Sequence, residues 1–239
     1  CCFADLDLKQ QGVIEDFQLL FYIIQPPTPE RVKYDIFDRV NRGGTPLNKQ
    51  EMRNALYRGR CTRMLDKLCC SPEFLIATGR SINKERMKDQ YVVLRAIAFL
   101  MLHRGEFKDI PALQYRGDID DFLARFMVYV NDNAPEKLIV DYENLFIRCM
   151  QISYDLLGEN GFRFSGNGIR RPINMPLFEA LSYLFSFVPE KIDYTWASRL
   201  ILDIESVKEE FDDSRYFSGN IDSTTSVSFR FDRMDKIIN

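Results

Sequence analysis

Apolar residues recur at every third or fourth position along most of the chain after Pro29, which is the spacing that one face of an α-helix requires. Gly, Pro and Asn residues interrupt this pattern and indicate where helices begin and end. Because the period is helical and the interruptions are short, we expect a chain that consists mainly of helices. The pattern predicts helices over residues 29–41, 48–58, 60–69, 72–78, 83–104, 118–131, 135–157, 174–187, 191–210 and 224–238.

One segment before these helices follows a different pattern. The residues from Phe17 to Gln25 are almost all aromatic or branched, and the run stops at Pro26-Pro27, which is typical of a strand. A strand needs a neighbour, and the later sequence offers no second strand. The chain also opens at Cys1 without an initiator Met. We therefore expect a mainly α fold with a small β element near the N-terminus, its sheet completed by residues that precede Cys1 or by a partner chain.

The stretch from Phe37 to Arg53 is the most specific part of the sequence. Asn48 is a good N-cap residue, and Glu51 stands three positions later, where a capping box requires it. Gly43-Gly44 lies just before this helix start and permits a sharp change of chain direction. These residues predict a helix, a glycine turn and a second helix. Much of the stretch is therefore explained by turn and cap chemistry.

Two residues of the stretch are not explained by the turn. Arg39 lies beside the apolar stripe of the first helix, and Asn41 shares a face with Arg39 only if the helix breaks near Asn41. A helix end beside a glycine turn, with further arginines close by, is suited to hold phosphate groups. The alternative is a solvated basic face. The candidate phosphate-binding residues are Arg39, Asn41, Arg42, Gly43, Gly44 and Arg53.

The charge distribution supports a local anion site more than general binding to polyanions. The chain has a formal net charge of -3, yet from Arg31 to Arg63 nine Lys or Arg residues stand against three acidic ones. The rest of the chain is correspondingly acidic. The 46% hydrophobic and 28% charged fractions are those of an ordinary globular protein, and no apolar run is long enough to span a bilayer.

The cysteines and the histidine limit the chemistry further. The six cysteines show no Cys-x-x-Cys pair and no signal peptide precedes them, so we expect a reduced, cytoplasmic compartment. His103 is the only histidine, which makes a histidine-based metal or nuclease site hard to build. We interpret it as a cation at the C-terminal end of the helix over 83–104. No catalytic residue and no metal ligand is assigned.

A second basic segment lies between two predicted helices. The loop from Gly158 to Pro172 interleaves Arg163, Arg170 and Arg171 with Phe162 and Phe164. Basic and aromatic side chains in one loop can hold phosphates and stack on a base. The alternative is a simple connection, although loops of this length are uncommon without a function. The three arginines are therefore candidate nucleic-acid contacts.

The pattern Phe-x-Arg-Val-Asn-x-x-Gly-x-x-Leu-x-x-x-Glu-x-Arg, which begins at Phe37, resembles the motif of the ParB/sulfiredoxin-like domain in GmrSD-type restriction enzymes. The upstream order of Phe3-Ala4-Asp5-Leu6, a short helix and a strand is also similar. Later segments, including Gly161-Phe162-Arg163 and Arg171 to Asn174, resemble the helical region that follows that domain. The resemblance implies a C-terminal part of a ParB/sulfiredoxin-like domain over residues 1–58 and a helical domain, a bundle, over residues 59–239.

The resemblance also implies a biochemical setting. Members of this family are associated with nucleotide hydrolysis and with restriction of modified phage DNA. Their nucleotide chemistry is attributed to an upstream Asp-Gly-Gln-Gln-Arg motif, which this sequence lacks, as it lacks a histidine-rich nuclease motif. Arg39 and Asn41 match positions that contact phosphates and metal in the wider superfamily. Because Val40 stands where an acidic residue precedes such an Asn, metal binding through this segment is not expected.

Two functions follow as hypotheses. In the first, the chain is part of a prokaryotic GmrSD-like, nucleotide-dependent DNA restriction or anti-phage defence protein, whose complete form would use a nucleoside triphosphate with Mg²⁺ and act on DNA. In the second, it is a non-enzymatic helical module that binds DNA or a protein through the loop from Arg163 to Arg171. A structural scaffold without a ligand is the third reading. No membrane partner is expected.

Overall fold

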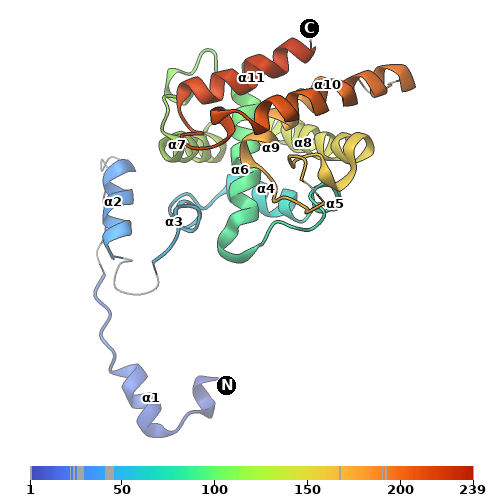
Figure 1. Cartoon of the computed structure of the whole chain (residues 1–239). Helices are drawn as coiled ribbons and strands as arrows, with labels where there is room; N and C mark the ends of the chain where they lie inside the picture. Colours follow the sequence, from blue (N-terminus) through green and yellow to red (C-terminus); the bar gives the residue numbers. More distant parts are fainter. Residues whose placement is uncertain are drawn as a thin grey trace. The chain divides into compact units, whose positions relative to one another are not determined.

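The computed structural model describes residues 2–21, 23, 25, 30–40, 46–166, 168–189, 191 and 193–238. The chain divides into two compact units, Cys1–Pro46 and Leu47–Asn239 (Figure 1). The division falls before the predicted boundary at residue 58, so the capped helix that starts after Asn48 belongs to the larger unit.

The described residues of the N-terminal unit form short helices. A 3-10 turn, η1 (Phe3–Asp5), precedes α1 (Leu8–Glu15), and α2 (Glu30–Val40) follows later. Asp7 caps α1 through the backbone N–H of Gln10, at 2.8 Å. No residue of α1 is buried. This unit therefore lacks a core in the part that the structure describes.

The strand predicted from Phe17 to Gln25 does not form among the described residues of that segment, which are 17–21, 23 and 25. The large apolar side chains of this segment are exposed to solvent; they are Phe17, Leu19, Leu20, Phe21 and Ile23. A strand exists only through the ladder it makes with a neighbour, and none of the described residues supplies one. The prediction of a β element is thus not met by this chain alone, and a sheet completed by other residues stays a prediction.

The larger unit is helical, as the periodicity predicts. Its helices are α3 (Lys49–Leu56), α4 (Arg60–Cys69), α5 (Pro72–Ala77), α6 (Lys88–His103), α7 (Ile119–Asp132), α8 (Glu136–Leu157), α9 (Met175–Phe185), α10 (Tyr194–Asp212) and α11 (Thr224–Ile238). Single 3-10 turns connect them at η3 (Glu85–Met87), η4 (Pro111–Leu113), η5 (Gly158–Asn160) and η6 (Arg215–Phe217). The helix predicted over 83–104 begins only at Lys88, because η3 precedes it.

Helix α6 lies at the centre of this unit, and α4, α7, α8 and α9 pack around it (Figure 1). Its residues from Val93 to Leu100 are almost all inaccessible to solvent, on every side of the helix. A helix that is apolar all round is one that other helices enclose. None of the helices formed by the described residues combines the length and the apolar character that a membrane span requires.

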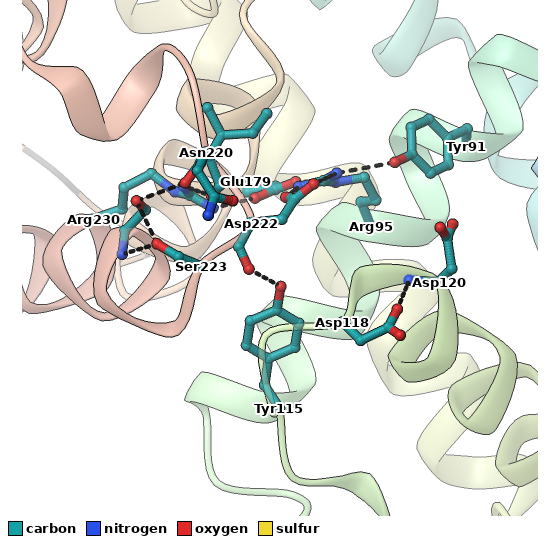
Figure 2. Close-up of polar contacts among 12 residues, drawn as sticks. Tyr91, Arg95, Tyr115, Asp118, Asp120, Glu179, Asn220, Asp222, Ser223 and Arg230 are labelled. Carbon is teal, nitrogen blue, oxygen red and sulfur yellow. Dashed lines mark hydrogen bonds and ion pairs between the residues drawn. The ribbon is translucent and has the colours of Figure 1, made fainter.

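A buried ion-pair network joins α6, α9 and α11 (Figure 2). The carboxylate of Glu179 accepts from Arg95 Nε with one oxygen and from Arg230 Nη2, at 3.1 Å, with the other. Arg95 also donates to Asp222 Oδ1, at 2.6 Å, and to the hydroxyl of Tyr91, at 3.0 Å. Two arginines and two carboxylates balance each other, so the network can be buried without excess charge.

His103 stands at the end of α6, but it is not the cation that the sequence suggests. Its ring stacks on Phe231, with ring centroids 3.6 Å apart, and lies edge-on to Tyr183. Burial, followed by the charge of Arg230, lowers the pKa of His103 to about 4. The interpretation of His103 as a helix-end cation is therefore wrong, because the ring is desolvated and neutral at neutral pH.

The described cysteines are all free thiols. Cys61, Cys69 and Cys149 are buried, and burial raises the pKa of each thiol. A buried thiol with a raised pKa is a poor nucleophile, so these three are core residues. A cytoplasmic location stays a prediction.

Candidate functional site

The predicted phosphate-binding residues fall in different parts of the chain. Arg39 is an exposed residue in the last turn of α2, within the N-terminal unit. Arg53 lies in α3, within the larger unit. Asn41, Arg42, Gly43 and Gly44 lie outside the described residues. The structure therefore gives geometry only for the Arg53 end of the predicted site.

The start of α3 forms the predicted capping box. Asn48 Oδ1 accepts hydrogen bonds from the backbone N–H groups of Gln50 and Glu51, at 2.8 and 2.9 Å. Glu51 Oε2 in turn accepts from the backbone N–H of Asn48, at 2.7 Å. The local prediction is confirmed. Because these N–H groups are already satisfied, the helix end orients its neighbours and does not itself offer donors to a ligand.

A cavity of about 500 Å³ opens beside this helix start, and we call it the α3 cavity. Three segments form its walls: the start of α3, the segment from Asn83 to Tyr91, and the start of α7. It is lined by Asn48, Lys49, Gln50, Arg53, Asn83, Glu85, Arg86, Lys88, Tyr91 and Asp120. Four of these are cationic and two are acidic, so the lining has an excess of positive charge.

Arg53 is fixed in the wall of this cavity. The residue is only 1% exposed, and its Nη1 donates to Asp120 Oδ1 at 2.8 Å. Its Nε and Nη2 both donate to Gln50 Oε1, at 3.1 and 3.0 Å, and its guanidinium lies 5.4 Å from the centre of the Tyr91 ring. Lys49 donates to the same Asp120 carboxylate. Asp120 thus accepts from two cations.

The titration of Asp120 reflects this pairing. Burial raises the pKa of the carboxyl, but the hydrogen bonds from Lys49 and Arg53 bring it below its ordinary value. Asp120 is accordingly an anion at neutral pH. Figure 2 labels Asp120 and Tyr91, and the hydroxyl of Tyr91 accepts from Arg95 of the buried ion-pair network.

The wall opposite α3 has a strained backbone. Arg86 and Met87 have φ values of 56° and 58°, the left-handed region that residues with a Cβ rarely adopt. Asn48 Nδ2 donates to the carbonyl oxygen of Arg86 at 2.7 Å, and Arg86 Nη2 donates to Glu51 Oε2 at 3.0 Å. The capping residues of α3 therefore also hold this strained segment. Strain of this kind clusters at binding sites.

Most residues of the α3 cavity could not be predicted from the sequence. Asp120, Arg86 and Lys88 come from segments that no motif connects to Arg53, and no glycine marks the left-handed backbone. Lys88 is exposed and makes no ion pair with the other described residues. Among the residues that the structure describes, no three His, Cys, Asp or Glu side chains converge as metal ligands. The lining of this cavity offers more cationic than anionic side chains.

The three arginines of the second basic segment meet around another cavity, of about 800 Å³, between that loop and α10, which we call the loop cavity. Arg163 is 5% exposed and donates to the carbonyl oxygens of Thr78, at 3.2 Å, and of Arg171. Arg170 pairs with Glu159 at 2.8 Å, and Arg171 pairs with Asp212. The guanidinium groups are therefore largely committed to the protein itself.

The aromatic residues of the same loop are core residues. Phe162 is inaccessible to solvent and packs on Phe178, with ring centroids 4.3 Å apart. Phe164 is 6% exposed, and Arg171 lies over its ring. The predicted stacking of bases on this loop is wrong for these two rings, because the helices around them already cover their faces.

Comparison of the chain with protein-family models, with curated proteins and with solved structures finds no match. The functional interpretation therefore rests on the sequence and on the geometry of the two cavities.

Proposed function

We propose that the chain binds a phosphate-bearing ligand, a nucleotide or the phosphates of DNA, in the α3 cavity. We further propose that it does so as part of a GmrSD-like, nucleotide-dependent DNA restriction or anti-phage defence protein. The single observation that carries the first proposal is the excess of cationic side chains in the lining of this cavity. The second proposal rests on the resemblance of residues 37–53 alone.

The charge excess has a specific origin. Asp120 accepts from both Lys49 and Arg53, and Lys88 has no anionic partner among the described residues. A phosphate group supplies the missing negative charge and accepts charge-assisted hydrogen bonds, which are stronger than neutral ones. The amides of Asn48 and Asn83 line the same cavity and add neutral polar groups to it. These features favour an anion over an uncharged ligand.

Three parts of the proposal come from the resemblance. Arg39 and Asn41 are proposed to contact phosphates, since they match the family motif. In the complete protein, a nucleoside triphosphate with Mg²⁺ is the proposed nucleotide. The segment from Phe17 to Gln25 is proposed to enter a sheet that a preceding segment or a partner chain completes, which would cover its exposed apolar side chains.

The alternative function, a non-enzymatic module that binds DNA or a protein through the loop of Arg163 to Arg171, has less support. The arginines of that loop are paired with Glu159 and Asp212, and Arg163 is buried. Polyanion binding draws on exposed cations whose counterions are released. We therefore place the DNA-facing or nucleotide-facing role at the α3 cavity.

The test is a titration of the whole chain with a fluorescent nucleoside triphosphate and, separately, with a short labelled DNA. Lys88→Ala removes a cation and should weaken binding by about three- to tenfold, whereas Glu85→Gln removes a competing anion and should strengthen it. Lys137→Ala, which removes an exposed lysine in α8, is the matched control and should bind as wild type does. Equal affinity in wild type and in both cavity variants would overturn the assignment.

A further inference from the structure

The loop cavity has a buried lysine in its lining. Lys208, on α10, is 5% exposed, and its ammonium group donates to Glu205 Oε1 at 2.9 Å and to the carbonyl oxygen of Asn160 at 3.4 Å. A lysine ammonium has three donors, so these two contacts leave one N–H for another acceptor. The cavity lining that includes Lys208 is where that acceptor would lie.

The cavity also gathers more positive than negative charge. Its lining contains Arg163, Arg170, Arg171 and Lys208 against the two carboxylates of Glu159 and Glu205, and Asp212 pairs with Arg171 from outside the lining, so one positive charge remains in excess. Both carboxylates are partly exposed surface groups, which water screens, whereas Lys208 is shielded from water. A buried cation that is paired only with a screened carboxylate gains more from a second anion than a surface cation does.

The walls of the loop cavity are closely built. Gly166 admits no side chain, because a Cβ there would lie 2.2 Å from the carbonyl oxygen of Ile169. Leu157, Phe164 and Ile169 add apolar surface beside the charged groups. A volume of about 800 Å³ lies within the range of small-molecule sites. The cavity therefore suits a small ligand with an anionic end and an apolar body.

Burial of Lys208 decides between a small molecule and a polymer. A phosphodiester in DNA or RNA carries a bulky sugar on each side of the phosphate, which keeps it away from a side chain that is 5% exposed. A phosphate monoester ends in three free oxygens, one of which can reach such a group.

We propose that the loop cavity binds a small organic molecule that bears a terminal phosphate monoester, with Lys208 holding the phosphate against the apolar wall. This site is independent of the α3 cavity, with which it shares no lining residue. Arg163 positions the loop through its bonds to the backbone and does not hold the ligand.

The experiment uses phenyl phosphate as the probe, which combines a phosphate monoester with an apolar ring. Binding to the whole chain is followed by saturation-transfer NMR and calorimetry. We expect saturable binding that Lys208→Met weakens by about tenfold or more, since a charge-assisted hydrogen bond is lost. Glu205→Gln should strengthen binding a few-fold, because it removes the carboxylate that competes for the ammonium. A merely structural lysine would not give opposite effects in these two variants.

Controls separate this site from the α3 cavity. Lys137→Met and Lys88→Ala should both bind phenyl phosphate as wild type does, and loss of binding in Lys88→Ala would assign the probe to the α3 cavity and overturn the proposal. Should Lys208→Met fail to fold, as judged by circular dichroism, Lys208→Gln takes its place with the same expected loss. Absence of saturable binding, unchanged affinity in the lysine variant, or equal affinity for diphenyl phosphate would each refute the proposal.

Discussion

The substitution Glu179→Gln tests whether the buried ion-pair network stabilises the packing of α6, α9 and α11. Glu179 is inaccessible to solvent, and each of its oxygens accepts from a different buried arginine, Arg95 or Arg230. Glutamine has nearly the same shape, but its NH₂ group donates hydrogen bonds where one carboxylate oxygen of Glu179 accepts them. Whichever way the amide is turned, its NH₂ group faces a guanidinium N–H.

The magnitude follows from the charge balance. In the wild type, Arg95 and Arg230 are balanced by Glu179 and Asp222, whereas the variant leaves the buried group with one uncompensated positive charge. Removing one partner from a buried ion pair costs about 3–5 kcal/mol. Arg230 Nε already has no partner in the part of the chain that the structure describes, so local rearrangement offers little relief.

The assay is urea unfolding followed by far-UV circular dichroism at neutral pH. Glu136→Gln is the matched control. Glu136 pairs with Arg60 at the surface, and this ion pair should contribute at most about 1 kcal/mol to stability. The triple variant Arg95→Met, Glu179→Leu and Arg230→Met should recover much of the lost stability, since an apolar core of similar volume needs no charge balance. A loss below about 1 kcal/mol for Glu179→Gln would refute the reasoning.

Two further predictions concern pH and backbone strain. His103 is neutral in the folded state, where its pKa is lowered to about 4, and is protonated in the unfolded chain below its ordinary value of 6.5. The free energy of unfolding should therefore fall as the pH falls below 6.5, by about 2 kcal/mol at about pH 5. In urea titrations at several pH values, His103→Phe should lack this part of the loss. An identical pH profile in wild type and variant would contradict the prediction. Arg80 has a φ of 52°, so Arg80→Gly should relieve backbone strain and raise the free energy of unfolding by about 0.5 kcal/mol. Arg63→Gly within α4 is the control and should lower it by about 1 kcal/mol. A loss of stability in Arg80→Gly would show that the backbone at this residue is not strained.

The sequence by itself determined the local structure of this protein. The helices from α3 to α11 follow from apolar periodicity, and the start of α3 follows from Asn48 and Glu51, because a cap joins groups only three residues apart. The sequence likewise indicates that arginines gather in the loop between α8 and α9, but it does not indicate what they contact. Such features depend on neighbours along the chain, which a sequence shows directly.

Only the tertiary structure decided the sites and the charge states. The α3 cavity joins Arg53 to Asp120 and Arg86 to Glu51, residues far apart in the sequence. Burial turned His103 into a neutral ring. The pattern from Phe17 to Gln25 predicts a strand, but a strand depends on a partner that the described residues do not provide. Desolvation and pairing arise between distant segments, so they become visible only when the packing is known.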